Sequence, residues 1–366
     1  NEIAPMAAEL DEKGEFPAEI IAKMGELGLM GVPFPEEYGG AGMDYVSYAT
    51  AVYEIARVCA STAITMAAHT SLGMTPIYLV GSEKQKRKYI PPLASGKMIG
   101  AFGLTEASAG SDAAATKTTA VKKGDEWIIN GSKVFTTNAG VAGVISITAK
   151  VIENDEEKGI GAFIIETDNP GLRIGPKEKK MGWNASDTRQ IFFEDLRVSD
   201  EQRLGKQVDG FRTFLKALVG GRISVGALSC GTAEGAYSAA LNYSHEREAF
   251  GKPIHKFQSV GFKLADMATE IEASKLLVYQ AAKKYDEGHN VVKEAAMAKL
   301  FASETAMKTT TEAIQVFGGY GYIKEYPAER FFRDAKVLTI GEGTSEIQKI
   351  IILREILKSL DNAISV

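Results

Sequence analysis

The sequence predicts a mainly α-helical protein with a β domain in the middle of the chain. Apolar residues recur at helical spacing in the first hundred residues and again from about residue 208, and the segment between holds short runs rich in Ile, Val, Phe and Thr. A chain of 366 residues is long enough for two or three domains. We therefore expect an N-terminal helical domain over residues 1–100, a β domain over 101–207 and a helical bundle over 208–366.

In the N-terminal region the helical pattern is clearest in residues 17–32. Four apolar residues there recur at helical spacing: Ile20, Ile21, Met24 and Leu27. The first residues begin without a capping signal and resemble the end of a helix. We expect the natural N-terminus, with any signal or transit peptide, to precede this sequence.

The middle region contains the short runs EWIING, GVISITAKV, GAFIIET and RQIFFEDLRV, separated by Gly, Asn and Asp. This pattern predicts strands joined by hairpins. Asn130-Gly131 is the strongest turn signal and would place residues 135–137 on the returning strand. The acidic segment 153–159 is expected to be a solvated turn.

The C-terminal region returns to helical periodicity. From Phe257 to Tyr285 an apolar or small residue recurs every three or four positions, and residues 291–317 show the same pattern with many alanines. Long helices of this kind are typical of a bundle. The segment 250–253 contains Gly and Pro, so we expect a helix to end at Arg247.

Composition excludes several classes of function. The net charge is −5 and no long Lys/Arg run occurs, which argues against nucleic-acid binding. The two cysteines and four histidines form neither a disulfide framework nor a metal-ligand spacing. The chain has no nicotinamide fingerprint, P-loop, zinc-protease or serine-hydrolase motif, and no apolar stretch approaches the ~18 residues of a membrane span.

Two glycine- and hydroxyl-rich segments, 101–118 and 130–140, stand out. Their hydroxyls and loop N–H groups can satisfy a polar ring system or phosphate oxygens, although each also fits an ordinary loop or strand. Arg247 has two interpretations as well. It can bind a phosphate bidentately, or it can simply favour the negative end of a helix dipole.

Glu342 lies between Gly341 and Gly343, just before a predicted helix. Ser345 and Gln348 have the spacing of a capping box for that helix. A carboxylate flanked by glycines can be approached closely by a ligand, although such a residue is more often part of a turn.

Taken in order, seven segments together resemble the acyl-CoA dehydrogenase family, and the overall pattern is closest to its short-chain or butyryl-CoA dehydrogenase branch. The segments are YGGAG (38–42), GSEKQKRKYIPPLASG (81–96), LTEASAGSD (104–112), KMGWNASDT (180–188), REAFGKPI (247–254), QVFGGYGY (315–322) and IGEGTSEIQ (340–348). The resemblance covers essentially the whole chain. It implies an N-terminal helical domain, a β-barrel-like domain and a C-terminal four-helix bundle, with FAD between the last two.

The resemblance also implies the site residues. Glu342 matches the catalytic base, and Ser111, Arg222 and Gly343 match substrate-binding positions. Some relatives carry the base at the position of Gly221 instead, so Glu342 is the one candidate here. FAD contacts are implied for Phe102, Leu104, Thr105, Gly110, Ser111, Phe135, Thr136, Thr137, Arg247, Phe250, Gln258, Gln315, Val316, Gly318, Gly319, Thr344 and Glu346. Among these, Arg247, Phe250 and Gln258 resemble residues that hold the FAD of a neighbouring subunit.

Four residues at three places depart from the family pattern. Phe135 stands where a Trp is usual, which affects flavin shielding. Ala107-Ser108 replaces a common Pro-Gly and alters the rigidity of the loop. Gly341 replaces a frequent Tyr beside the base, which enlarges the pocket and weakens any inference about chain length.

The implied reaction is FAD-dependent α,β-dehydrogenation of a saturated acyl-CoA in β-oxidation. Glu342 would take the α-proton, hydride would pass from Cβ to the flavin, and a trans-2-enoyl-CoA would form. Implied partners are a short straight-chain acyl-CoA, electron-transfer flavoprotein and further copies of the chain in a homotetramer built as a dimer of dimers. No metal, nucleic acid or membrane insertion is implied.

Two other readings stay open. One is an acyl-CoA oxidase that uses oxygen, although such oxidases are usually much longer. The other is a non-catalytic or nucleic-acid-binding relative of the fold, against which the intact Glu342 and the acidic pI of about 5.7 argue. The expected location is the cytoplasm of a bacterium or the mitochondrial matrix of a eukaryote.

Overall fold

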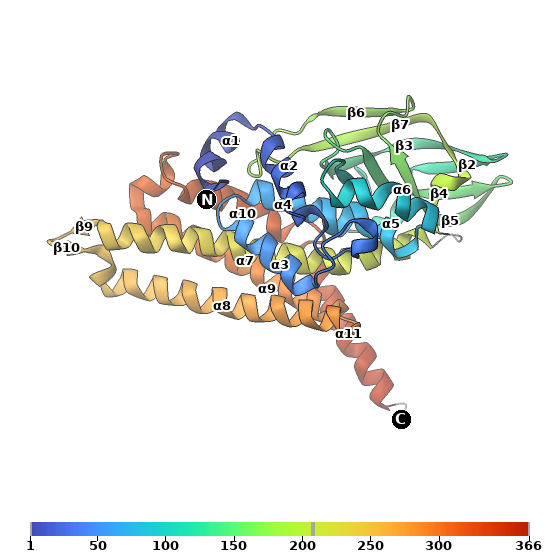
Figure 1. Cartoon of the computed structure of the whole chain (residues 1–366). Helices are drawn as coiled ribbons and strands as arrows, with labels where there is room; N and C mark the ends of the chain where they lie inside the picture. Colours follow the sequence, from blue (N-terminus) through green and yellow to red (C-terminus); the bar gives the residue numbers. More distant parts are fainter. Residues whose placement is uncertain (1, 206–208, 365–366) are drawn as a thin grey trace.

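The computed structural model describes residues 2–205 and 209–364. Short helices form the N-terminal part, a β-sheet the middle and long helices the C-terminal part, as the sequence predicts (Figure 1). Strand β1 begins at Gly100 and helix α7 at Gly210. The domain boundary expected between residues 207 and 208 lies outside the described residues.

The N-terminal part consists of α1 (Ala7–Lys13), α2 (Ala18–Glu26), α3 (Tyr45–Ala56), α4 (Ala60–Ala67), α5 (Thr75–Val80) and α6 (Glu83–Ala94). Ile20, Ile21 and Met24 of α2 are buried, as their spacing predicts. The prediction for Leu27 was wrong, because this side chain is 75% exposed. Helix α2 ends at Glu26, so Leu27 is its C-cap and lies outside the helix. Gly28, with a positive φ of 76°, then turns the chain away.

A π-helical segment, Ala68–Met74, joins α4 to α5, and all seven of its residues are buried. Such segments are rare and occur often at functional sites. Gly73 of this segment packs on Gly100 of β1 (Gly100–Gly103). A Cβ at Gly73 would lie 2.7 Å from the carbonyl carbon of Gly100, so glycine is needed for this close approach.

The β domain is one mixed sheet that includes β2 (Thr119–Lys123), β3 (Glu126–Thr137), β4 (Val144–Glu153), β5 (Glu156–Glu166), β6 (Leu172–Lys177), β7 (Thr188–Ser199) and β8 (Arg203–Leu204). The strand order is β6-β7-β3-β2-β4-β5-β8, and β1 pairs in parallel with β4. Of the acidic segment 153–159, only Asn154 and Asp155, both with positive φ, form the β4–β5 turn, while Glu153 ends β4 and Glu156 begins β5. Two-residue turns with positive φ at both positions match the twist of hairpin strands.

The hairpin predicted at Asn130-Gly131 does not form. Strand β3 runs straight through these residues, and a β-bulge there shifts its register against β7. The Asn130 side chain pairs with Asp195 of β7, donating to its carboxylate at 3.0 Å and accepting from its N–H at 2.8 Å. The prediction was wrong because both residues pair across the sheet, Asn130 with Thr119 of β2 and Gly131 with Phe193 of β7, and the extra residue of the bulge lies on β7.

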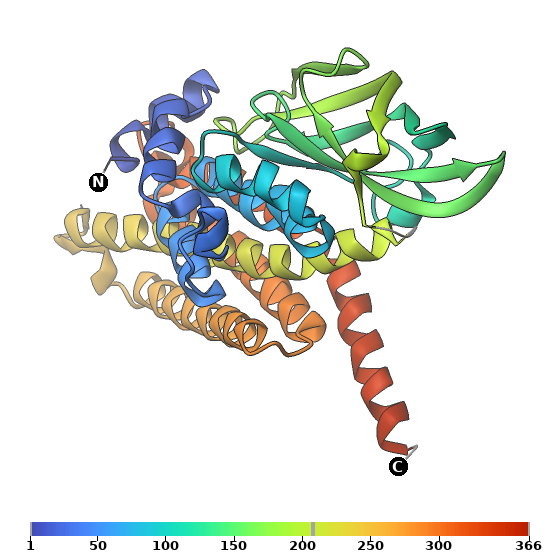
Figure 2. The same ribbon diagram turned by 45° about the vertical axis from the view of Figure 1, so that its right-hand side comes forward.

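The C-terminal part contains α7 (Gly210–Glu246), α8 (Gln258–Asp286), α9 (Val292–Phe317), α10 (Ala328–Lys336) and α11 (Ser345–Ile364), with the small hairpin β9 (Glu248–Ala249) and β10 (Lys252–Pro253) after α7. Helix α7 is long and apolar enough to cross a membrane, but 83% of its apolar window is buried, so it is the core helix of the bundle. Helix α11 extends away from the rest of the chain (Figure 2).

Candidate active site

Glu342 lies in the short connection between α10 and α11, with a φ of 53°, and Gly343 follows with a φ of 97°. The expected capping box does not form. Thr344 caps α11 instead, because its hydroxyl accepts from the N–H of Ile347 at 3.3 Å. The Gln348 side chain turns back and donates to the carbonyl oxygen of Glu342 at 3.1 Å. The hydroxyl of Ser345 donates to Glu304.

The Glu342 side chain is held in an apolar environment. Both carboxylate oxygens are inaccessible to solvent and accept no hydrogen bond from any described residue. Burial raises the pKa of Glu342 to about 7, and the nearby cations Arg222 and Lys299 act in the opposite direction. A carboxyl group with a pKa near neutrality and free lone pairs is well suited to act as a general base.

The carboxylate of Glu342 faces Gly221, at a point where α7 presents no side chain. A Cβ at Gly221 would lie 2.1 Å from Oε2 of Glu342 and 3.1 Å from Leu72, a residue of the π-helical segment. The base is therefore enclosed between the loop that carries it, the middle of α7 and the π-helical wall. Arg222, the next residue on α7, is buried, and its Nε atom has no partner among the described residues.

A buried ion pair between Lys133 and Glu106 anchors the loop that follows β1. Lys133 of β3 donates to Glu106 at 2.8 Å and to the carbonyl oxygen of Leu104 at 3.2 Å. The carbonyl oxygen of Thr105 accepts from Val134 at 2.8 Å. Burial acts to raise the pKa of Glu106, but hydrogen bonds from Lys133 and Thr116 lower it to about 2. This network keeps Leu104 and Thr105 in one conformation.

The residues expected along the flavin ring lie around this anchored loop. Thr136 is buried, and its hydroxyl has no partner among the described residues, while its neighbour Phe135 has a φ of 55° and is 69% exposed. Phe102 stacks on Phe214 of α7 at 4.2 Å between ring centroids. Gly110 is exposed, and a Cβ there would have no atom within 4 Å. An unpaired buried hydroxyl beside an exposed aromatic ring fits a large polar ring system at this edge.

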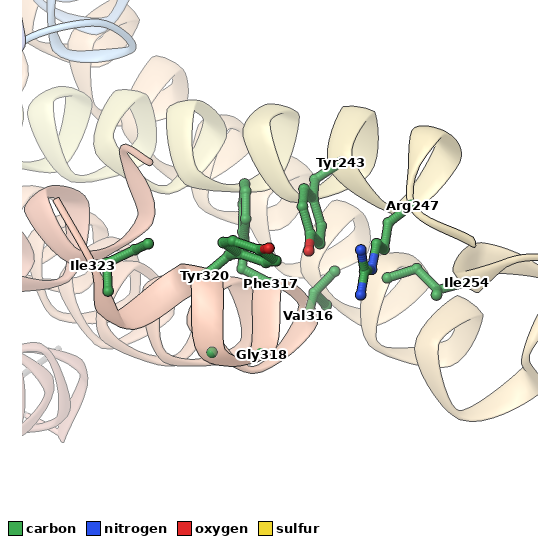
Figure 3. A pocket seen from close by; sticks show the side chains of 9 residues that line it. Tyr243, Arg247, Ile254, Val316, Phe317, Gly318, Tyr320 and Ile323 are labelled. Carbon is green, nitrogen blue, oxygen red and sulfur yellow. The ribbon is translucent and has the colours of Figure 1, made fainter. Parts of the chain in front are cut away.

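A second group of the expected FAD contacts lies at the other end of the bundle. A cavity of about 440 Å³ is lined by Arg247, Val316, Gly318 and Gly319 together with Tyr243, Ile254, Phe317, Tyr320 and Ile323 (Figure 3). The guanidinium of Arg247 lies 5.8 Å from the ring centre of Tyr320. Phe250 at the β9–β10 hairpin is 96% exposed, and Gln258 and Gln315 are also exposed.

The structure does not bring the two groups together within one chain. Arg222 lies beside the base in the middle of α7, and Arg247 is the C-cap of the same helix. The 25 positions between them correspond to about 37 Å along the axis of an α-helix. Figure 1 shows the hairpin and the sheet at opposite ends of α7. One dinucleotide cannot reach both groups of a single chain.

Sequence reasoning missed several residues that shape the site. Lys299 and Gln348 are fully buried and donate to the carbonyl oxygen of Gly343. His69 of the π-helical segment connects α6 to β1, because one ring nitrogen bonds the carbonyl of Leu93 at 3.1 Å and the other accepts from Gly100 at 2.9 Å. A lone lysine among the alanines of AAMAKLFA was the one available signal for Lys299.

Comparison with known proteins assigns the whole chain. It matches the family models of the acyl-CoA dehydrogenase N-terminal domain over residues 1–97, the middle domain over 101–196 and the C-terminal domain over 208–357. The short-chain specific acyl-CoA dehydrogenase of Clostridium acetobutylicum is 49% identical over 98% of this chain and 94% of that protein.

Two solved structures are similar over almost their full length. Butyryl-CoA dehydrogenase from Megasphaera elsdenii is 45% identical, with a TM-score of 0.95, and the match covers 98% of this chain and 94% of that one. A chain in a structure described as the electron transferring flavoprotein of Acidaminococcus fermentans is 50% identical, with a TM-score of 0.95 and coverage of 97% and 93%.

Proposed function

This chain belongs to the acyl-CoA dehydrogenase family, and from that premise we propose that it oxidises short straight-chain acyl-CoA thioesters and passes the electrons to electron-transfer flavoprotein. It is a flavoprotein with FAD as cofactor. The observation that carries the proposal is the Glu342 carboxylate, buried without a hydrogen-bond partner among the described residues and facing the bare backbone of Gly221.

Glu342 accepts the α-proton of the thioester. The proton is far less acidic than a free glutamic acid, whose pKa is about 4.3, so a base with a raised pKa is the better match. The buried Arg222 and Lys299 place positive charge near the reacting centre, where negative charge develops as the proton leaves. FAD, when bound, supplies the acceptor for the hydride that leaves Cβ.

The chain's own residues fit FAD at two places. Phe102, Leu104, Thr105, Phe135, Thr136 and Thr137 would hold the ring system at the edge of the β domain, where the Thr136 hydroxyl is unpaired. Arg247, Phe250 and the glycines of the cavity at the far end of α7 would hold the adenosine diphosphate part of a FAD whose ring lies in another copy of the chain.

Preference for a short acyl chain is supported by the names of two similar proteins. The Clostridium relative is described as short-chain specific and the Megasphaera structure as a butyryl-CoA dehydrogenase. Gly341 leaves open space beside the base, since a Cβ there would meet one atom among the described residues, the carbonyl oxygen of Val337 at 3.5 Å. The similar chain in the electron transferring flavoprotein structure supports the proposed electron acceptor.

The test is anaerobic mixing of the FAD-loaded protein with saturated acyl-CoAs from four carbons upward, including branched ones. We expect the flavin absorbance to bleach fastest with a straight chain of four to six carbons. Reoxidation should be fast with electron-transfer flavoprotein and slow with air. Bleaching by none of the acyl-CoAs would refute the reaction, and rapid reoxidation by air would identify an oxidase instead.

An assembly of several copies is proposed on two grounds. The FAD contacts of one chain lie at opposite ends of α7, so a complete site needs a second copy. Helix α11 also carries an exposed apolar stripe at three- and four-residue spacing, formed by Ile350, Leu353, Leu357 and Leu360, all at least 50% exposed. A homotetramer built as a dimer of dimers would cover both surfaces.

Arg247→Ala tests the shared site. A charge-assisted hydrogen bond to a phosphate is worth about 1.5–3 kcal/mol, so the variant should retain FAD at least about tenfold more weakly. The fraction of protein that keeps FAD should turn over at close to the parent rate. FAD content after dilution and gel filtration is the measurement. Arg173→Ala, which removes an exposed arginine of β6, is the matched control, and equal FAD retention in the two variants would refute the contact.

A further inference from the structure

The loop that carries the base has a backbone conformation that needs support. Glu342 has a φ of 53° and Gly343 a φ of 97°, so two successive residues are in the left-handed region. A residue with a Cβ atom is unfavourable in this region, and Glu342 is such a residue. Residues in such conformations persist when their surroundings over-determine them. The groups that bind the backbone carbonyl oxygens of Glu342 and Gly343 therefore determine the direction of the Glu342 carboxylate.

Two buried side chains hold these carbonyl groups. Lys299 of α9 donates from Nζ to the carbonyl oxygen of Gly343 at 2.9 Å. Gln348 of α11 donates from Nε2 to the carbonyl oxygens of Gly343 at 2.9 Å and of Glu342 at 3.1 Å. Both side chains are 0% exposed. The carbonyl groups thus face Lys299 of α9 and Gln348 of α11, while the Glu342 carboxylate lies against Gly221 of α7.

Lys299 has no other task in the structure. Its neighbours on α9 are the buried alanines 295, 296, 298 and 302, and its ammonium group forms no ion pair with a described residue. Burying an ammonium group away from water is costly unless a nearby group compensates. Desolvation lowers the pKa of Lys299 to about 8, and Glu342 is the group that raises it most. The lysine and the base therefore compensate each other's burial.

Four elements supply the charged and titratable groups around the Glu342 carboxylate and its cations: Tyr45 and Tyr48 on α3, Arg222 on α7, Lys299 and Glu304 on α9, and Glu346 and Arg354 on α11. The two cations that lower the pKa of the base are Arg222 and Lys299. Gln348 contacts the same turn without carrying charge. Lys299 and Gln348 can therefore be compared directly: both donate to the Glu342–Gly343 turn, and only Lys299 is charged.

We propose that Lys299 and Gln348 are the positioning residues of the base: together they hold the Glu342–Gly343 turn, and Lys299 in addition places a positive charge near the carboxylate. The proposal rests on the assignment of Glu342 as the base. Neither residue touches the reacting atoms. Lys299 acts through the carbonyl of Gly343 and through its charge, and Gln348 acts through the two carbonyl groups.

The experiment compares Lys299→Met and Gln348→Met in the FAD-loaded enzyme. Both variants lose a donor but keep a long side chain, so both should slow anaerobic flavin reduction by about tenfold to a hundredfold. In both, backbone amide hydrogen exchange of the 340–346 segment should rise about tenfold. Lys299→Met alone should also raise the pH at which the reduction rate is half-maximal, by about one unit, because a cation near the carboxylate is lost.

Two further variants sharpen the comparison. Lys299→Arg keeps the charge and should restore the pH midpoint more fully than the rate. Lys308→Met removes an exposed lysine from the same helix, paired with Glu270, and should leave the rate, the midpoint and the exchange unchanged.

A parent-like pH midpoint and parent-like loop exchange in Lys299→Met would overturn the proposal. If Lys299→Met does not fold, the other two variants decide. Parent-like hydrogen exchange of the 340–346 segment in Gln348→Met would overturn the proposal. A pH midpoint raised by about one unit in Lys299→Arg, as expected for loss of the charge, would also overturn it. Failure of the underlying function has a different signature. Glu342→Gln would then reduce flavin at the parent rate, whatever the behaviour of Lys299.

Discussion

Glu342→Gln should bind acyl-CoA and FAD like the parent but reduce the flavin on the order of 10²–10⁴-fold more slowly, which is the usual contribution of a positioned general base. Glutamine has nearly the same shape and cannot accept the proton. Among the described residues, the groups around the carboxylate are poor replacements for it as a base near pH 7: Arg222 and Lys299 are cations, and burial raises the pKa of both Tyr45 and Tyr48, so these phenols stay protonated. The variant should therefore reduce the flavin slowly across the neutral pH range.

The measurement is anaerobic stopped-flow reduction, with FAD absorbance and acyl-CoA binding as checks that the variant is intact. In the parent enzyme the rate should fall as the pH drops below about 7, because protonated Glu342 cannot accept a proton. Glu342→Gln should show no such dependence. A variant rate within tenfold of the parent would remove Glu342 from its role.

Moving the carboxylate to α7 should restore part of the activity. In Glu342→Gly the base is lost, while in Gly221→Glu with Glu342→Gly a carboxylate enters from the opposite wall. The structure supports this exchange, because a Cβ at Gly221 would lie 2.1 Å from Oε2 of Glu342, so both positions border the same space. Glutamate is also a better helix former than glycine in the middle of α7. Recovery should be partial, since small misplacements of a catalytic group are costly.

Gly221→Glu alone is the informative control. With Glu342 still present, the new side chain must displace the existing carboxylate, and two acidic groups so close together cannot both ionise. This variant should be slower than the parent. The double variant should be faster than Glu342→Gly on at least one acyl-CoA, and the preferred chain length should shift because the pocket wall changes at Leu72. A double variant no faster than Glu342→Gly on any substrate would show that Gly221 does not face the α-carbon.

Local sequence patterns predicted the secondary structure correctly where interactions between neighbouring residues determine it. Helical periodicity identified α8 and α9 almost to their ends, and the acidic turn between β4 and β5 followed from its composition. The same kind of signal failed at Asn130-Gly131 and at Ser345 and Gln348. Each of those patterns is compatible with two local structures, and a partner distant in sequence chose between them: Asp195 for the bulge and the Glu342–Gly343 turn for the glutamine.

The sequence by itself determined the order of the three parts, because side-chain periodicity is a property of neighbouring residues. The candidate base, Glu342, was identified from the resemblance of its ordered motifs to the family. Only the tertiary structure decided what surrounds that base. It placed Gly221 and Leu72 near the carboxylate, buried Lys299 beside the turn, and separated the two groups of expected FAD contacts along α7. These features arise from packing between elements far apart in the chain, so burial and geometry there depend on the whole fold and cannot be derived from any single segment.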